Sequence, residues 1–241
     1  MALRIMNNLS ALNAQRNLTN TQNSLSKSME RLSSGLKINR AADDAAGLSI
    51  SQQFRSDLAA YGAASNNAAQ AGSMLKVAEG GLDSTHGMLT RLKELAVQAA
   101  SDNTINKQAL DDEAQEIIGE ITRVAESTKY NSISLIDGTY VGAGSQLTIQ
   151  VGSENNTDQR IQFNIGAATA SAIGVTGGNN LTDVDLVGSL GSAQTSIDII
   201  NVAISDISSV RAEIGANMNR LSYTSSNLAI TMENVSASES V

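Results

Sequence analysis

Apolar residues recur at steps of three and four over most of this 241-residue chain, and this spacing predicts helices over 1–40, 45–100, 105–129 and 193–236. The last stretch has the most regular stripe, interrupted only by Arg211 and Ser225. The apolar positions that we expect to form a helix-packing seam are Ile197, Ile200, Ile204, Ile207, Ile214, Met218, Leu221 and Leu228. A stripe this long is unstable in water, so it must pack against other helices of the chain or against copies of it.

The first stretch has a less regular stripe, with a register shift between Leu12 and Leu18. Gly35 is a plausible helix stop, and Asp43 or Asp44 is placed to cap the next helix. The apolar positions of this first helix are Ile5, Leu9, Leu12, Leu18, Leu25, Met29 and Leu32. Like the seam, this stripe needs a partner to cover it.

In residues 131–166 the spacing of the apolar residues changes to every second position. Apolar residues alternate with polar ones over 147–151 and again over 161–165, and the polar link between them predicts a β-hairpin. Residues 166–192 read as loop with weak strand character. The predicted fold is therefore mainly α: an elongated rod of long parallel or antiparallel helices with coiled-coil-type packing, plus a small β-hairpin region.

This pattern divides the chain into four parts. We expect an N-terminal helical segment over 1–40, a helical rod over 41–130, a β-hairpin and loop region over 131–192, and a C-terminal rod helix over 193–241.

The composition supports long helices and excludes several classes of function. The chain has no Pro, 2% aromatic residues and a formal net charge of −8, which argues against nucleic acid as a partner. No apolar run is long enough to span a membrane, and there is no Cys. The N-terminus lacks the features of a cleaved signal peptide, so we expect that a secreted form would leave the cell by another route.

The residues that could carry chemistry form no catalytic or metal-binding set. His86 is the only histidine, and an exposed helix position explains it better than a catalytic base does. Asp43–Asp44 and the acidic run 111–113 fit helix caps and first-turn acids better than a cation site. Asn155 and Asn180 open tripeptides of the N-glycosylation pattern, which arise often by chance here. We therefore expect no enzyme and no cofactor.

Residues 31–48, RLSSGLKINRAADDAAGL, strongly resemble the N-terminal signature of bacterial flagellins. Residues 5–15 and 92–100 are similar to the family as well, and residues 208–221 resemble its last rod helix. The resemblance implies a subunit that polymerises into the extracellular flagellar filament, in a short form without outer variable domains. It also implies that the chain ends pair as helices lining an inner tube, and that capping and junction proteins and the flagellar export machinery are partners.

Flagellins continue past the rod helix into a further apolar helix, whereas this sequence ends at Val241. The expectation is that either these 241 residues are a fragment of a longer protein, or residues 1–40 pack elsewhere or stay disordered. A polypeptide of these 241 residues alone should form no stable filament, and should be cut by proteases within 1–40 but resist them from near Asp44.

The resemblance further implies recognition by the vertebrate Toll-like receptor that senses flagellin. The matching positions are Arg91, Leu95 and Glu113, and the first two lie four residues apart on one helix face. In the alternative reading, Leu95 is core and Arg91 is solvated. A different function also stays open: a hook–filament junction protein, or another coiled-coil surface interaction protein.

Overall fold

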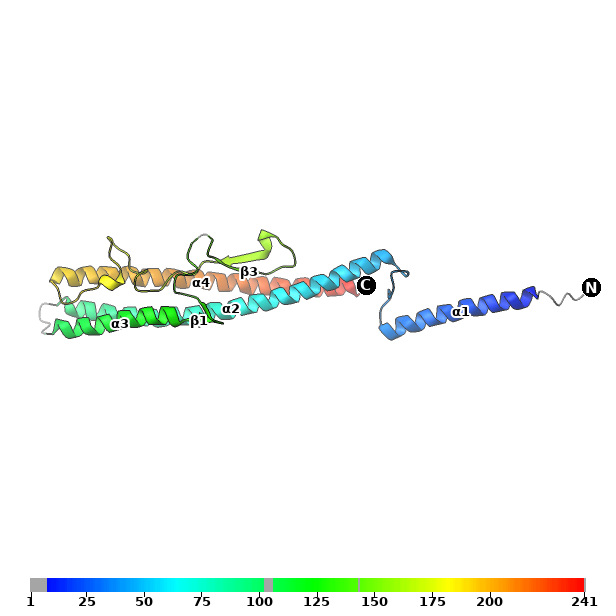
Figure 1. Cartoon of the computed structure of the whole chain (residues 1–241), viewed down its shortest axis with the longest axis horizontal. Helices are drawn as coiled ribbons and strands as arrows, with labels where there is room; N and C mark the ends of the chain where they lie inside the picture. Colours follow the sequence, from blue (N-terminus) through cyan, green and yellow to red (C-terminus); the bar gives the residue numbers. More distant parts are fainter. Residues whose placement is uncertain (1–7, 102–105, 143, 241) are drawn as a thin grey trace, which may run out of the picture. The chain divides into compact units, whose positions relative to one another are not determined.

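Long helices make up most of the chain in the computed structural model, which describes residues 8–101, 106–142 and 144–240 (Figure 1). They are α1 (Leu9–Ser34), α2 (Ala45–Ala99), α3 (Lys107–Ser127) and α4 (Leu190–Glu239). The chain divides into two compact units, one of residues 1–58 with 235–241 and one of residues 59–234. The boundary between the units falls within α2 and within α4. The mainly α class is confirmed, and each predicted helix is present among the described residues, with described bounds shifted by up to six residues. Residues 1–7 of the first predicted helix lie outside the described residues.

In the first unit, local hydrogen bonds set the ends of the helices. The Asn8 side chain accepts from the amide of Ala11 and caps α1. Gly35 ends the helix with a φ of 70°, a left-handed conformation that glycine adopts without strain. Asp44 Oδ1 accepts from the amides of Ala46 and Gly47, both at 3.0 Å, and so caps α2. Of the two aspartates considered for this cap, Asp44 is the one used.

In the second unit, α2, α3 and α4 lie side by side (Figure 1). The core is formed by aliphatic residues at helical spacing on all three helices. Fully buried members include Leu75, Leu82, Leu89 and Leu92 of α2, Ala114 and Ile121 of α3, and Ile200 and Ile207 of α4. Alanines at 64, 68 and 71 are buried where α2 enters this unit, and such small side chains let a neighbouring helix approach closely. The core thus uses aliphatic side chains almost alone, as the composition implied.

Two small antiparallel hairpins interrupt the helices. The predicted hairpin is present as β3 (Leu147–Gln150) and β4 (Arg160–Phe163), with Ile149 opposite Ile161. A second hairpin, β1 (Lys129–Tyr130) with β2 (Ile133–Ser134), was not predicted. Its turn residues, Asn131 and Ser132, both have positive φ, which matches the twist of a tight hairpin.

The segment between β4 and α4 is irregular, as expected, but it is part of the core. Its only regular element is a short 3₁₀ turn, η2 (Leu181–Asp183). We call residues 164–189 the covering segment, because seven of its apolar side chains are buried: Ile165, Ala168, Ala170, Ile173, Leu181, Val184 and Leu186. This cover explains why Ile199 and Ala203, which lie outside the predicted seam, are also buried on α4.

Polar contacts hold this covering segment in place. The Gly174 amide donates to Asp206 Oδ2 on α4 at 3.0 Å, and the Leu186 amide donates to Asp111 Oδ1 on α3 at 3.0 Å. Gln115 donates to the carbonyl of Val184 at 2.9 Å. The segment is therefore tied to both α3 and α4 through its backbone.

Candidate functional site

The apolar stripe of α1 lies fully on the surface. No described residue of this helix is buried, and the large apolar side chains at positions 9, 12, 18, 25, 29 and 32 are between 50% and 82% exposed. Ile5, the first residue of the predicted stripe, lies outside the described residues. A stripe of this kind is far more apolar than a solvated helix face needs, so it marks an interaction surface.

The apolar positions predicted for the seam of α4 all lie inside the second unit. Ile200, Ile207, Ile214, Leu221 and Leu228 are buried, whereas Ile197, Ile204 and Met218 are partly buried and pack against the core. Arg211, the polar interruption, donates to Glu79 of α2 at 3.2 Å and lies 3.0 Å from Asp83. A charged residue at a seam position with paired carboxylates favours one register of α4 against α2.

Arg91 and Glu113, predicted together from the resemblance, are in direct contact. Two guanidinium nitrogens of Arg91 on α2 donate to Glu113 Oε1 on α3, at 3.0 and 2.8 Å, and a third donates to Glu94 at 3.1 Å. The Glu113 carboxylate, with a smaller effect of Glu94, raises the pKa of Arg91. The two side chains are about half exposed and form one surface across two helices.

Leu95 is not part of the surface formed by Arg91 and Glu113. Its side chain is 0% exposed and belongs to the core between the helices. In this structure it supports the helix that carries Arg91 and offers no surface of its own.

The first unit contains a cleft of about 690 Å³, lined by the end of α1, the loop over 35–44, the start of α2 and the end of α4. Two ion pairs contribute to its lining: Lys27 with Asp43 at 2.7 Å, and Arg55 with Glu239 at 2.5 Å. A third, Arg40 with Glu30 at 2.9 Å, joins the loop to α1. Arg31 and Lys37 also line the cleft, and neither forms an ion pair with any described residue. Asp44 lines the cleft as well and forms no ion pair with a described residue, so the unpaired charged groups of the cleft are two basic and one acidic.

The residues considered for chemistry have structural roles in the described parts of the chain. The acidic run 111–113 lies in the second turn of α3, not in its first turn, and Asn106 caps the helix. Asn180 caps η2 through its own side chain. His86 is partly buried instead of exposed, and its Nδ1 has no hydrogen-bond partner among the described residues.

The described residues contain no cluster of three or more potential metal ligands. Within the same residues, no helix has both the length and the hydropathy of a membrane span. What the chain presents is a set of surfaces on helices.

Sequence reasoning missed the contacts that involve the covering segment. Asp111, Gln115 and Asp206 each bind a backbone group of residues 174–186, and no periodicity in the sequence links these positions. The one available signal is the Gly and Asn content of the segment, which marks turns but does not say which helix they contact.

Comparison with known proteins gives a consistent result over the whole chain. The family model of the bacterial flagellin N-terminal helical region matches residues 5–141, and that of the bacterial flagellin C-terminal helical region matches residues 197–241. The flagellin of Halalkalibacterium halodurans is 38% identical over 239 residues, which cover 98% of this chain and 84% of that protein. The flagellin of Bacillus subtilis is 36% identical over 263 residues, covering 99% and 86% respectively.

Solved structures of flagellar proteins are similar to this chain as well. The crystal structure of Bacillus cereus flagellin superposes with a TM-score of 0.52 at 28% identity, covering 68% of this chain and 88% of that one. A Vibrio parahaemolyticus protein described as flagellar hook-associated has a TM-score of 0.66, covering 83% and 97%. Its identity of 16% supports a shared fold and no more.

Proposed function

Because this chain belongs to the bacterial flagellin family, whose members build the flagellar filament, we propose that its helix α1 lines the inner tube of that filament. The chain is a structural subunit that polymerises with itself, and it is not an enzyme. Its place is the extracellular part of the flagellum. The proposal concerns how one surface serves that role.

The exposed stripe of α1 carries this proposal. Covering one Leu, Ile or Met side chain contributes roughly 1.5–3 kcal/mol, so covering the six described positions contributes on the order of 10 kcal/mol per subunit. That is comparable to the whole stability of a small domain. Packing of apolar helices around the stripe in the inner tube is therefore a strong driving force for polymerisation.

The test is a polar substitution within the stripe. In cells that express Leu25→Gln with Leu32→Gln, we expect the subunit to be secreted as monomer and filaments to be absent or short. Because both leucines are exposed in the subunit, its helicity should change little. Electron microscopy and the ratio of sheared filament to monomer in the medium measure the effect.

The control is Asn20→Gln with Asn23→Gln, which alters the opposite side of the same helix. These filaments should be normal. Normal filaments from the leucine variant as well would rule out the proposed role of the stripe.

The subunit also needs a path to the filament tip. We propose that it passes unfolded through the flagellar export machinery and is added with the help of the capping and junction proteins. Its extracellular place in the flagellum supports this route, and the chain has no cysteine that could form a disulfide and obstruct the passage. Secretion of the chain at normal levels by cells without a functional flagellar export apparatus would contradict it.

A second role rests on the pair formed by Arg91 and Glu113. We propose that this joined surface contacts the vertebrate Toll-like flagellin receptor, with Leu95 acting from the core by holding α2 in position. An arginine beside a carboxylate at a helix pair is a common anchor of protein interfaces. The buried position of Leu95 distinguishes its role from that of the two charged residues.

Receptor signalling by monomeric subunit tests this role. Arg91→Ala and Glu113→Ala should each reduce potency, and the double variant should lose less than the sum because the two groups act together. The matched control removes an exposed arginine–glutamate pair within α3, Arg123 with Glu120. Undiminished signalling by the Arg91 and Glu113 variants would exclude the contact.

A further inference from the structure

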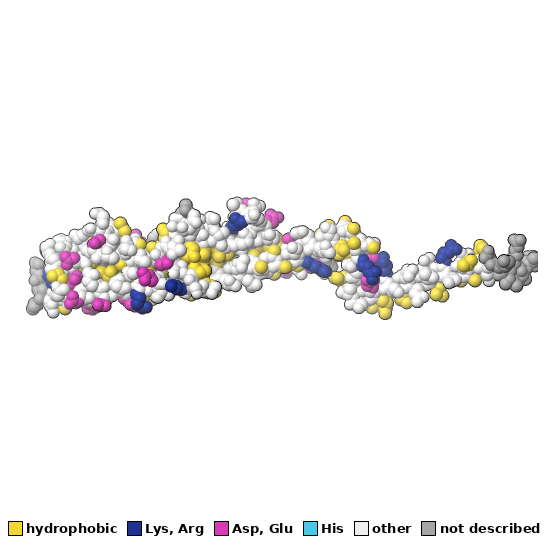
Figure 2. All heavy atoms as spheres, viewed as in Figure 1, with side chains coloured by type: hydrophobic (Ala, Val, Ile, Leu, Met, Phe, Trp, Pro, Cys, Tyr) yellow, Lys and Arg dark blue, Asp and Glu magenta, His cyan; other side chains and the backbone are white. Residues whose placement is uncertain are grey.

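Charge is distributed unevenly between the two units. The first unit has seven basic and five acidic residues, a net charge of +2, whereas the second has nine basic and 19 acidic residues, a net charge of −10. Figure 2 shows acidic side chains gathered over the second unit, at the end that includes α3. This separation suggests two surfaces of opposite sign on every copy.

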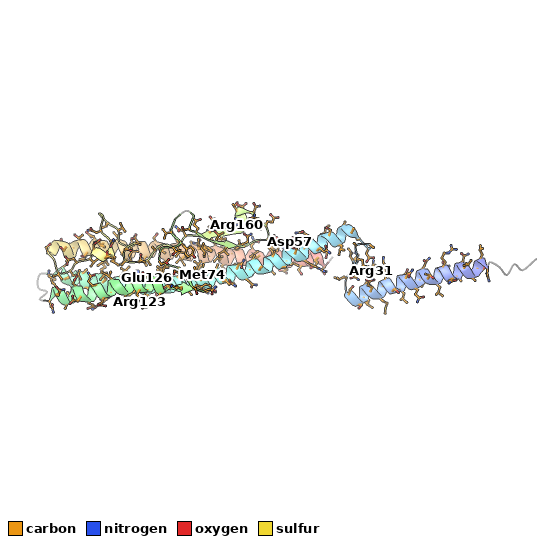
Figure 3. All side chains as sticks on the ribbon, viewed as in Figure 1. Arg31, Asp57, Met74, Arg123, Glu126 and Arg160 are labelled. Carbon is orange, nitrogen blue, oxygen red and sulfur yellow. The ribbon has the colours of Figure 1, made fainter. Side chains whose placement is uncertain are left out.

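The basic surface lies on α1 and the loop that follows it. At 100° per residue, Arg16, Lys27 and Arg31 fall on one side of α1, and Leu18, Leu25 and Leu32 fall on the opposite side. Leu9 and Leu12, which precede the register shift, fall on the same side as the basic residues. Covering Leu18, Leu25 and Leu32 in the filament therefore leaves the side of Lys27 and Arg31 accessible. Lys27 is paired with Asp43, but Arg16, Arg31 and Lys37 form no ion pair with any described residue. We call these three residues the basic patch; Arg31 is labelled at the end of α1 in Figure 3.

The acidic surface lies on the outer side of α3. Glu113 and Glu120 are paired with arginines, whereas Asp112, Glu116 and Glu126 are exposed and form no ion pair with any described residue. The three fall within about one quarter of the helix circumference. We call them the acidic face; Glu126 is labelled on α3 in Figure 3.

We propose that the basic patch of one copy contacts the acidic face of a second copy in the filament. Two different, complementary surfaces on each copy make a head-to-tail contact that repeats without closing, which is the kind of contact that a filament requires. A subunit of net charge −8 also repels its copies, and a contact between opposite charges offsets that repulsion where it is strongest.

The first test is charge reversal with rescue, in filaments sheared from cells. Arg31→Glu with Lys37→Glu should raise the ratio of free monomer to filament about tenfold, and so should Asp112→Lys with Glu116→Lys. A chain carrying all four substitutions should give a ratio of free monomer to filament close to that of the unaltered chain, because opposite charges then face each other again.

The control is a reversal of equal size away from both surfaces, Lys76→Glu with Arg220→Glu, which are exposed and form no ion pair with described residues. It should leave the ratio nearly unchanged. A control effect as large as that of the basic-patch variant, or no rescue by the fourfold variant, would overturn the proposal.

The second test measures proximity directly and uses the absence of cysteine from the chain. Cells express Lys37→Cys and Glu116→Cys on separate copies, and their mixed filaments are treated with a short reagent that joins two thiols. We expect a cross-linked dimer on a denaturing gel, and none from filaments of either variant alone. The control mixture is Lys76→Cys with Glu213→Cys, both exposed positions.

Mixed filaments that form normally but give no more dimer than the control mixture would overturn the contact, while leaving self-polymerisation itself intact. Because each copy carries one thiol, a dimer from the Lys37 and Glu116 mixture can arise only between copies.

Discussion

Asp43 joins the loop after α1 to the helix itself through its ion pair with Lys27, and its side chain is only 7% exposed. The hydrogen bond from the Lys27 ammonium is the main reason that the pKa of Asp43 lies below its ordinary value. A carboxyl group with a lowered pKa stabilises the folded loop above its ordinary pKa, and that stabilisation is lost as the pH falls through the lowered value.

We therefore expect the loop over 35–44 to loosen on acidification below about pH 4. Asp43→Asn should loosen it already at neutral pH, and should abolish the further change in acid. Amide hydrogen exchange of residues 39–44, corrected for the intrinsic rate at each pH, measures both effects. Equal protection of the loop in the variant and the unaltered chain at pH 7 would contradict this role of Asp43.

Gly174 is a second residue whose identity is fixed by its surroundings. Its φ is +72°, and an added Cβ would lie 2.8 Å from the carbonyl oxygen of Ile199 on α4. A side chain there meets both backbone strain and a steric clash with the backbone of a helix that cannot easily move.

Gly174→Ala should lower the free energy of unfolding by about 2–4 kcal/mol, as measured by urea denaturation. Gly177→Ala is the matched control, because Gly177 also has a positive φ but no atom within 4 Å of an added Cβ. It should cost only about 1–2 kcal/mol. Equal effects of the two substitutions would show that the contact with α4 does not matter.

At the scale of elements, helices were predictable because their apolar stripes extend over many turns. The breaks between them were predictable where a single residue sets the end, as Gly35 and Asp44 do. The hairpin of β1 and β2 was not, since each strand has only two residues and no alternation can be read from so short a run. The covering segment has the sequence pattern of a loop, because its burial arises from contacts distant in sequence.

For the candidate site too, contacts between residues distant in sequence could not be predicted. The residues of the α1 stripe and the Arg91 and Glu113 positions could be named from the sequence, through spacing and through resemblance. The burial of Leu95 could not be decided, because a position on one helix face can be core or surface until the neighbouring helix is placed.

The seam of α4 gives the element-scale prediction. Leu221 is 4% exposed, so Leu221→Asp places an unpaired charge among apolar side chains and should lower the free energy of unfolding by more than about 3 kcal/mol. Ile204→Asp should cost less, because Ile204 is only partly buried. Ser222→Asp, at an exposed neighbouring position, is the control. Thermal unfolding followed by circular dichroism ranks the three, and unchanged midpoints for both seam variants would refute the packing role.

At the scale of the whole molecule, the two units differ in how much apolar surface they bury. All of the described residues of α1 are at least partly exposed, whereas the second unit contains the buried core. A helix without buried side chains opens readily, because little free energy opposes its local unfolding.

Limited proteolysis of the monomer should therefore cut first within residues 9–44 and leave a resistant fragment that contains α3 and the covering segment. In assembled filaments the same sites should be protected. Mass spectrometry of the early fragments identifies the cuts; a first cut within 59–234 would contradict the difference in stability between the units.

Burial along α4 is dense near its start and sparse further on. Six side chains are buried between residues 193 and 207, where the covering segment adds contacts. Beyond that, the buried positions 214, 221 and 228 are seven residues apart. Folding that begins at the dense end gains the most contacts for the fewest ordered residues. We therefore expect α4 to fold in one direction, from residue 190 toward residue 234.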